Sequence, residues 1–183
     1  MGERGWERWA PPLADDAALL AAVMATHQAL LREALAAEPA LNTAIQIEVR
    51  ASRRIEDWRV MLLLTPWMLV RLLFPDTPPE IAVPEGWDAE GRGDAPYQVL
   101  GPRCSFRLLG MAQTAHLCFQ PTLGHYLLQP ICLDLQPYRD ADAVLEAWSH
   151  VIGIRDENLE QARRECPMQR EVSRREFFTR FRS

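Results

Sequence analysis

The amino-acid sequence predicts one α+β domain, with a mainly antiparallel sheet of about four to five strands covered by an N-terminal and a C-terminal helix. Two observations support this fold class. Apolar residues recur at helical spacing near both ends of the chain, and the apolar runs between them are short and bounded by turn residues. The 183 residues are enough for one domain with an ordinary core.

The first helix is expected to begin at Asp15 or Asp16, either of which can cap it, and to end at about Ala37, before Pro39. Its apolar residues fall on one stripe, so it packs against the rest of the domain. The stripe consists of Leu20, Val23, Met24, His27, Leu31, Ala34 and Leu35. On such a stripe, His27 is expected to be a core histidine and not a ligand.

The next two elements are expected to form a β-hairpin. Residues 40–50 switch to alternating apolar and polar side chains, which is typical of a strand with one solvated face. Residues 52–57 are polar and predict a turn. Trp58–Leu64 then forms a second strand, with apolar side chains on both faces near its end.

The segment 76–96 is rich in proline, glycine and acidic residues and predicts a long surface loop. Three more strands are expected after it, at residues 97–109, 114–119 and 126–135.

The last predicted element is a helix over residues 141–152. Asp140 can cap its start, and Gly153 is expected to end it. We therefore predict three parts: a flexible N-terminus (1–14), the α+β domain (15–153) and a C-terminal tail (154–183).

Composition excludes several classes of function. The net charge of −5 argues against a general nucleic-acid binder, which must neutralise phosphates. All 20 basic residues are arginine, so lysine chemistry is excluded. The four cysteines show no C-x-x-C pairing and no zinc-ligand spacing, so we expect reduced thiols, no metal and no cofactor.

The sequence also predicts a cytoplasmic protein without stable membrane insertion. The first nine residues contain no apolar stretch of the kind found in a secretory leader. The one membrane candidate, Val60–Phe74, contains Pro66 and Arg71 and is shorter than the about 20 residues needed to cross a bilayer.

The most informative segment is Val60–Pro75. One apolar run enters a turn at Thr65–Met68, with the sequence Thr-Pro-Trp-Met, and a second apolar run leaves the turn and ends in Phe74 and Pro75. This block resembles the Thr-Pro-Trp-Met signature of the HybE family of nickel-iron hydrogenase assembly chaperones. The resemblance covers about residues 41–152.

The resemblance implies a binding protein with no catalytic activity. Its expected partner is the precursor of a hydrogenase small subunit, including the twin-arginine leader, which is bound before export; the large subunit is a further candidate. The partner-binding residues expected from the block are Thr65, Pro66, Trp67, Met68, Leu69, Phe74 and Pro75.

A different interpretation of the same block stays open. Trp67 and Met68 are also suited to ordinary core filling after a buried strand. Leu69, Leu72 and Leu73 stand at helical spacing and are compatible with a short helix that turns Arg71 towards solvent.

The C-terminal tail is locally basic, and it contains the sequence Ser-Arg-Arg-Glu-Phe-Phe at residues 173–178. This resembles the Ser-Arg-Arg-x-Phe-Leu core of a twin-arginine leader, and five residues after it the given sequence ends. A mimic of the client's leader would use Ser173, Arg174, Arg175, Phe177 and Phe178. The same residues also form a capping box followed by the apolar stripe of a short helix. Both interpretations stay open.

Two alternative functions were considered. His116 and Cys118 stand two residues apart on a predicted strand and could form the nucleophile pair of a small thiol enzyme, provided that the thiol is exposed and its pKa is lowered. An accessory subunit of a redox complex is the other alternative. No nucleotide-binding, hydrolase or metalloprotease motif is present, and we assign no catalytic and no metal-binding residue.

Overall fold

An antiparallel sheet forms the middle layer of the molecule, with its six strands in the order β1-β2-β3-β6-β5-β4. The computed structural model describes residues 5–7 and 15–165. The strands are β1 (Glu48–Ile55), β2 (Trp58–Thr65), β3 (Met68–Pro75), β4 (Arg103–Leu108), β5 (Met111–Gln120) and β6 (Gly124–Cys132). The predicted antiparallel sheet is confirmed, with slightly more strands than expected.

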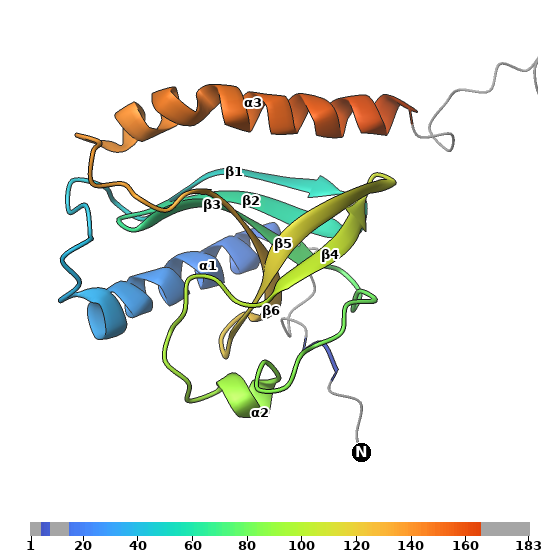
Figure 1. Cartoon of the computed structure of the whole chain (residues 1–183), viewed down its shortest axis with the longest axis horizontal. Helices are drawn as coiled ribbons and strands as arrows, with labels where there is room; N and C mark the ends of the chain where they lie inside the picture. The colour runs from blue at the N-terminus through green and yellow to red at the C-terminus, as the bar shows by residue number, and fades with distance from the viewer. Residues whose placement is uncertain (1–4, 8–14, 166–183) are drawn as a thin grey trace, which may run out of the picture.

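The helices are α1 (Asp16–Leu30), which continues as the π-helical turn η1 (Leu31–Leu35), the short α2 (Ala89–Arg92) and the long α3 (Ala141–Glu165). The two longer helices, α1 and α3, cover opposite faces of the sheet, and α2 lies in the segment between β3 and β4 (Figure 1). Leu19 and Val23 of α1 pack into one core cluster, and Val144 of α3 packs into another. The predicted single-domain α+β fold is confirmed.

Both predicted helix caps are present. The Asp15 carboxylate accepts a hydrogen bond from the Ala18 N–H at 2.9 Å, and the Asp140 carboxylate accepts one from the Ala143 N–H at 2.8 Å. Such bonds satisfy donors that a helix leaves unpaired in its first turn, so each aspartate fixes where its helix begins.

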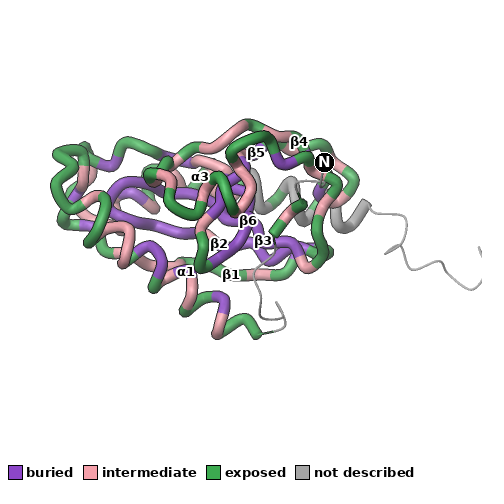
Figure 2. The backbone as a smooth tube through the Cα atoms, turned by 90° about the horizontal axis from the view of Figure 1, so that it is seen from below, coloured by how far each residue is buried: buried purple, intermediate pink, exposed green. Residues whose placement is uncertain are grey.

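The short helix considered for residues 69–73 is wrong, because these residues belong to β3 at the centre of the sheet. Every residue of β3 is buried, and Figure 2 shows the same for most of the central strands. In the register with β2, Leu72 lies opposite Met61 in the α1 cluster, whereas Leu69 lies opposite Leu64 in the α3 cluster. A strand covered on both faces loses the alternation that identifies strands in sequences.

Arg71 is also buried, contrary to the solvent position considered for it. It is 4% exposed, and its guanidinium donates a hydrogen bond to the Ile152 carbonyl at 3.1 Å. Arg71 thereby connects the middle of β3 to α3.

The first strand begins later than predicted. Residues 40–47 form turns and irregular structure, β1 spans Glu48–Ile55, and the polar segment predicted as a turn is mostly strand. β1 stands at the edge of the sheet and is largely exposed, so its polar residues are compatible with strand pairing.

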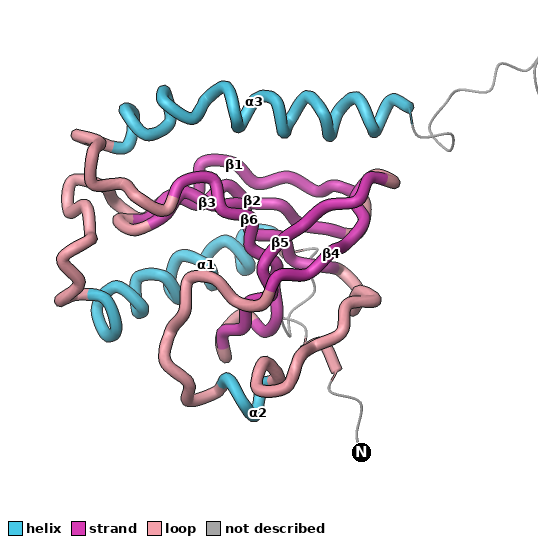
Figure 3. The backbone as a smooth tube through the Cα atoms, viewed as in Figure 1, coloured by secondary structure: helices cyan, strands magenta, loops and turns pink. Residues whose placement is uncertain are grey.

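The strand predicted at 97–109 is limited to β4, and a loop precedes it (Figure 3). The Pro102 carbonyl accepts from the Leu117 N–H at 2.8 Å, and a Cβ at Gly101 would stand 1.8 Å from the Leu117 carbonyl oxygen. This close approach requires a glycine, and Pro102 has no N–H for a ladder. β5 contains all of the predicted strand 114–119, and β6 ends three residues before the prediction.

The expected helix end at Gly153 is wrong. α3 continues through this residue to Glu165, so the predicted boundary between domain and tail falls inside a helix. Gly153 is not among the glycines with positive φ, and nothing lies within 4 Å of a Cβ added there. A glycine on an open helix surface costs only about 1 kcal/mol relative to alanine, so it does not by itself end a helix.

Candidate functional site

The turn at Thr65–Met68 joins β2 to β3 as predicted, and Thr65 organises it. Its hydroxyl oxygen accepts from the N–H groups of Trp67 (3.3 Å) and Met68 (3.1 Å) and donates to the Met68 carbonyl (3.3 Å). Pro66 presets the backbone for such a turn, and its carbonyl accepts from the Asn42 N–H at 2.9 Å. The sequence Thr-Pro-Trp-Met therefore builds one rigid hairpin turn.

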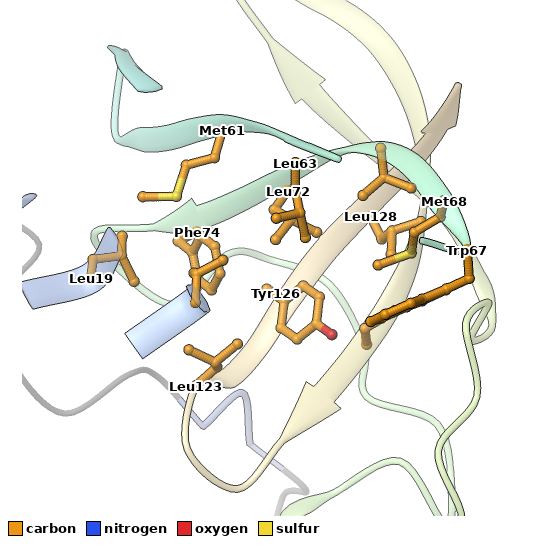
Figure 4. Close-up of a cluster of buried hydrophobic side chains, with 13 residues drawn as sticks. Leu19, Met61, Leu63, Trp67, Met68, Leu72, Phe74, Leu123, Tyr126 and Leu128 are labelled. Carbon is orange, nitrogen blue, oxygen red and sulfur yellow. The ribbon is translucent and has the colours of Figure 1, made fainter. Parts of the chain in front are cut away.

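Trp67 points inwards from this turn. It is 8% exposed and closes the end of the cluster that contains Met68, Leu128 and Tyr126 (Figure 4). Its ring stacks on His27 of α1, and its indole N–H donates to the Tyr97 hydroxyl at 3.2 Å. Trp67 thus joins the hairpin, α1 and the segment before β4.

All seven residues that the sequence marked for partner binding are buried in this structure. Among them, Thr65, Met68 and Leu69 are fully inaccessible, and Phe74 stacks on Tyr126 with ring centroids 5.4 Å apart. The structure thus brings the block together as a scaffold. Whether the block also contributes to partner binding stays a prediction.

Cys118 and His116 do not form the arrangement that a thiol enzyme needs. Cys118 is 3% exposed, and burial raises the pKa of its thiol to about 12. A reactive cysteine requires the opposite shift and access for a substrate. The Nδ1 of His116 donates to the Gly101 carbonyl at 2.7 Å, so this imidazole supports the loop before β4.

The sequence did not predict the structural role of His125, which is 1% exposed and connects three segments. Its Nδ1 accepts from the Glu7 N–H, and its Nε2 donates to the Trp87 carbonyl, each at 2.7 Å. Part of the N-terminus predicted to be flexible, residues 5–7, is therefore held against β6. These contacts join residues more than 35 positions apart, so no local pattern announces them.

An apolar groove lies between α1 and the turn that joins β5 to β6. It has a volume of about 490 Å³. The helix contributes mostly small side chains to its wall, and residues 120–122 form the opposite side. A smaller groove of about 350 Å³, lined by residues of β4, β5 and β6, has a more polar lining.

Two further site classes find no support among the residues that the structure describes. No three histidine, cysteine or acidic side chains of this part gather where they could hold a metal ion. No helix of this part combines the length and the apolar character needed to cross a membrane.

A family model described as "[NiFe]-hydrogenase assembly, chaperone, HybE" matches residues 18–180 of the chain. The chain belongs to the HybE family. No curated protein and no solved structure matches it. The family consists of chaperones for hydrogenase assembly, so the resemblance expected from the Thr-Pro-Trp-Met block is confirmed.

The HybE match extends past the described residues into the C-terminal tail. Residues 173–178, with their twin-arginine-like sequence, lie inside the matched range but outside the residues that the structure describes. The match also includes most of α1 and the whole sheet, and with them both walls of the apolar groove.

Proposed function

We propose that this HybE-family chaperone acts in the cytoplasm, where it binds the precursor of a nickel-iron hydrogenase small subunit, including its twin-arginine leader, before export. The main support for the proposal is the family match over residues 18–180, because this family is described as chaperones for hydrogenase assembly. The leader is part of the precursor that has not yet been exported, so a chaperone that binds the leader must act on this precursor. The large subunit is a second candidate partner.

The geometry favours binding over catalysis. In the described part of the chain, the candidate nucleophile Cys118 is buried with a raised pKa, whereas an apolar groove is open on the surface. The Thr65–Pro75 block supports binding by fixing α1, the hairpin and the loop before β4 relative to one another.

The tail adds a regulatory element to the proposal. Arg174, Arg175, Phe177 and Phe178 present the same chemical pattern as the leader core, so the tail competes with the client for one site. Such competition keeps client binding transient, with an affinity of about micromolar, which a chaperone needs in order to release its client.

Affinity purification of the tagged chain from cells that contain both precursor and mature hydrogenase tests the proposal. We expect the precursor to be retained and the mature enzyme to be absent. Recovery of the mature enzyme at fixed stoichiometry would instead identify an accessory subunit of the redox complex and contradict chaperone action.

A further inference from the structure

The apolar groove is a preformed feature with two walls joined to each other. One wall is α1 with Glu33 and Ala34 of η1, and the other is the end of β5 with the start of the β5–β6 turn, residues 120–122. The hydroxyls of Thr26 and Thr122, one from each wall, are hydrogen-bonded at 2.6 Å. This bond satisfies both polar groups and holds the walls at a fixed distance, so a ligand meets a groove that needs little rearrangement.

The outer side of α1 is unusual for a surface helix. Solvent-facing helix positions usually carry charged residues. α1 contains no arginine and a single acidic residue, Asp16. The Asp16 carboxylate forms an ion pair with Arg59 at 2.6 Å. Along the groove, the exposed and half-exposed positions of α1 and η1 are one acidic residue, Glu33, and otherwise alanines and one leucine: Ala22, Ala25, Ala29, Leu30 and Ala34.

Small side chains on the helix wall leave room for large side chains of a ligand. The groove volume of about 490 Å³ is within the range found for ligand pockets. An occupant with bulky apolar side chains would remove this surface from water, which is favourable by about 25 cal/mol per Å² of apolar area.

One acidic side chain lies in the groove, next in sequence to Arg32, and a segment with several acidic residues lies near one of the groove walls. Glu33 lies in the groove wall. The segment 76–96 carries six acidic residues and one arginine, and it lies beside the β5–β6 turn, where the Trp87 carbonyl accepts from His125. Figure 3 shows α2, which belongs to this segment, next to that turn. One turn therefore has an apolar groove on one side and an acidic segment on the other.

We infer that this groove is the docking site for the leader of the client precursor, with the apolar stretch of the leader in the groove and its paired arginines facing Glu33 and the acidic segment 76–96. This inference rests on the proposed function and specifies where the leader binds. A peptide with adjacent arginines followed by an apolar stretch complements the groove in both charge and polarity.

Substitutions at the helix wall test the inference in the full chain. Ala29→Trp fills the open groove with a large side chain without placing it in the core. The matched control Gln28→Trp places the same side chain at the neighbouring position, which is exposed and outside the groove. The probe is a fluorescein-labelled peptide with Ser-Arg-Arg-x-Phe-Leu followed by the apolar stretch of the leader, measured by anisotropy. Thermal melting checks that both variants fold, and Ala25→Trp provides a second groove variant.

We expect Ala29→Trp and Ala25→Trp to weaken peptide binding by about tenfold or more, and Gln28→Trp to change it by less than about twofold. Glu33→Arg should weaken binding and reduce its salt dependence, whereas Glu38→Arg, at an exposed residue beyond η1, should have a smaller effect. A peptide with both arginines replaced by glutamine should lose the Glu33 effect.

Three results would overturn the inference. Unchanged peptide affinity in both folded groove variants would place the leader elsewhere and leave the proposed function intact. Equal loss in Ala29→Trp and Gln28→Trp would also exclude the groove. Absence of peptide binding to the unmodified chain would overturn the inference together with the leader part of the proposed function, while retention of the precursor would still support chaperone action.

Discussion

The indole of Trp67, in the turn between β2 and β3, stacks on the imidazole of His27 in α1, with ring centroids 6.3 Å apart and planes inclined by 24°. His27 is fully buried, and its Nδ1 donates to the Val23 carbonyl at 2.7 Å. The contact fastens the Thr-Pro-Trp-Met turn to the helix that forms one wall of the apolar groove. The Thr-Pro-Trp-Met turn therefore supports the proposed binding surface through a contact in the core, because it holds α1 in place.

Trp67→Ala should destabilise the protein by about 3–5 kcal/mol, because it removes a large buried side chain and leaves a cavity. Tyr97→Phe, which removes only the hydroxyl that accepts from the indole N–H, should cost about 1 kcal/mol. Chemical denaturation measures both. Trp148→Ala is the matched control, since Trp148 is half-buried on α3 and should cost less. A free energy of unfolding unchanged by Trp67→Ala would contradict the core role.

Stability should fall as the pH drops below 6.5. Burial lowers the pKa of His27 from 6.5 to about 4, while the hydrogen bond to Val23 acts weakly in the opposite direction. The unfolded chain therefore binds a proton between these values that the folded chain does not. The resulting loss should reach about 2 kcal/mol at pH 5 and about 3 kcal/mol below pH 4. Above pH 6.5 this residue should contribute no pH dependence.

The His27 effect can be isolated with His27→Gln. Its free energy of unfolding, compared with that of the unmodified chain between pH 7 and pH 4.5, should show a shallower decline. His150→Gln is the control, because His150 is exposed on α3. Equal slopes for all three proteins would contradict the buried, neutral imidazole.

The sequence predicted features that depend on neighbouring residues and missed those that depend on distant ones. Asp15 and Asp140 begin their helices with local hydrogen bonds, so their spacing alone identified them. By contrast, the strand at 68–75 was ambiguous because helices from both ends of the chain cover its two faces. Gly153 looked like a helix end, yet the helix continues because nothing in its backbone requires a left-handed residue.

The candidate site shows the same division. The turn at Thr65–Met68 was predictable, because threonine and proline specify it locally. The direction of Trp67 was not, since it depends on His27 and Tyr97, which lie 40 positions before it and 30 after it. The groove was not predictable either, because it exists only where α1 meets the β5–β6 turn.

Cys118 should be chemically silent in the folded protein. Because Cys118 is 3% exposed and its pKa is raised to about 12, an alkylating reagent at pH 8 should modify the half-buried Cys104 before Cys118. Peptide mass spectrometry after short exposure, with and without denaturant, measures the order. Modification of Cys118 in the native protein before Cys104 would revive the thiol-enzyme alternative.

The tail should compete with the client. Replacing both Arg174 and Arg175 by glutamine should tighten binding of a labelled leader peptide by about threefold, the gain expected if the tail occupies the site two-thirds of the time. The gain should shrink at high salt, because the contacts are partly ionic. Unchanged affinity would leave a capped helix as the explanation of the motif, and weaker affinity would mean that the tail helps to hold the client.

The central claim is that the chain holds a hydrogenase small-subunit precursor through its leader, and one titration tests it most directly. Purified full-length chain is titrated with the small-subunit precursor and, separately, with the same subunit lacking its leader. The account predicts a dissociation constant of about micromolar for the precursor and at least about tenfold weaker binding without the leader. Equal affinity for both forms, or tighter binding of the leaderless subunit, would contradict it.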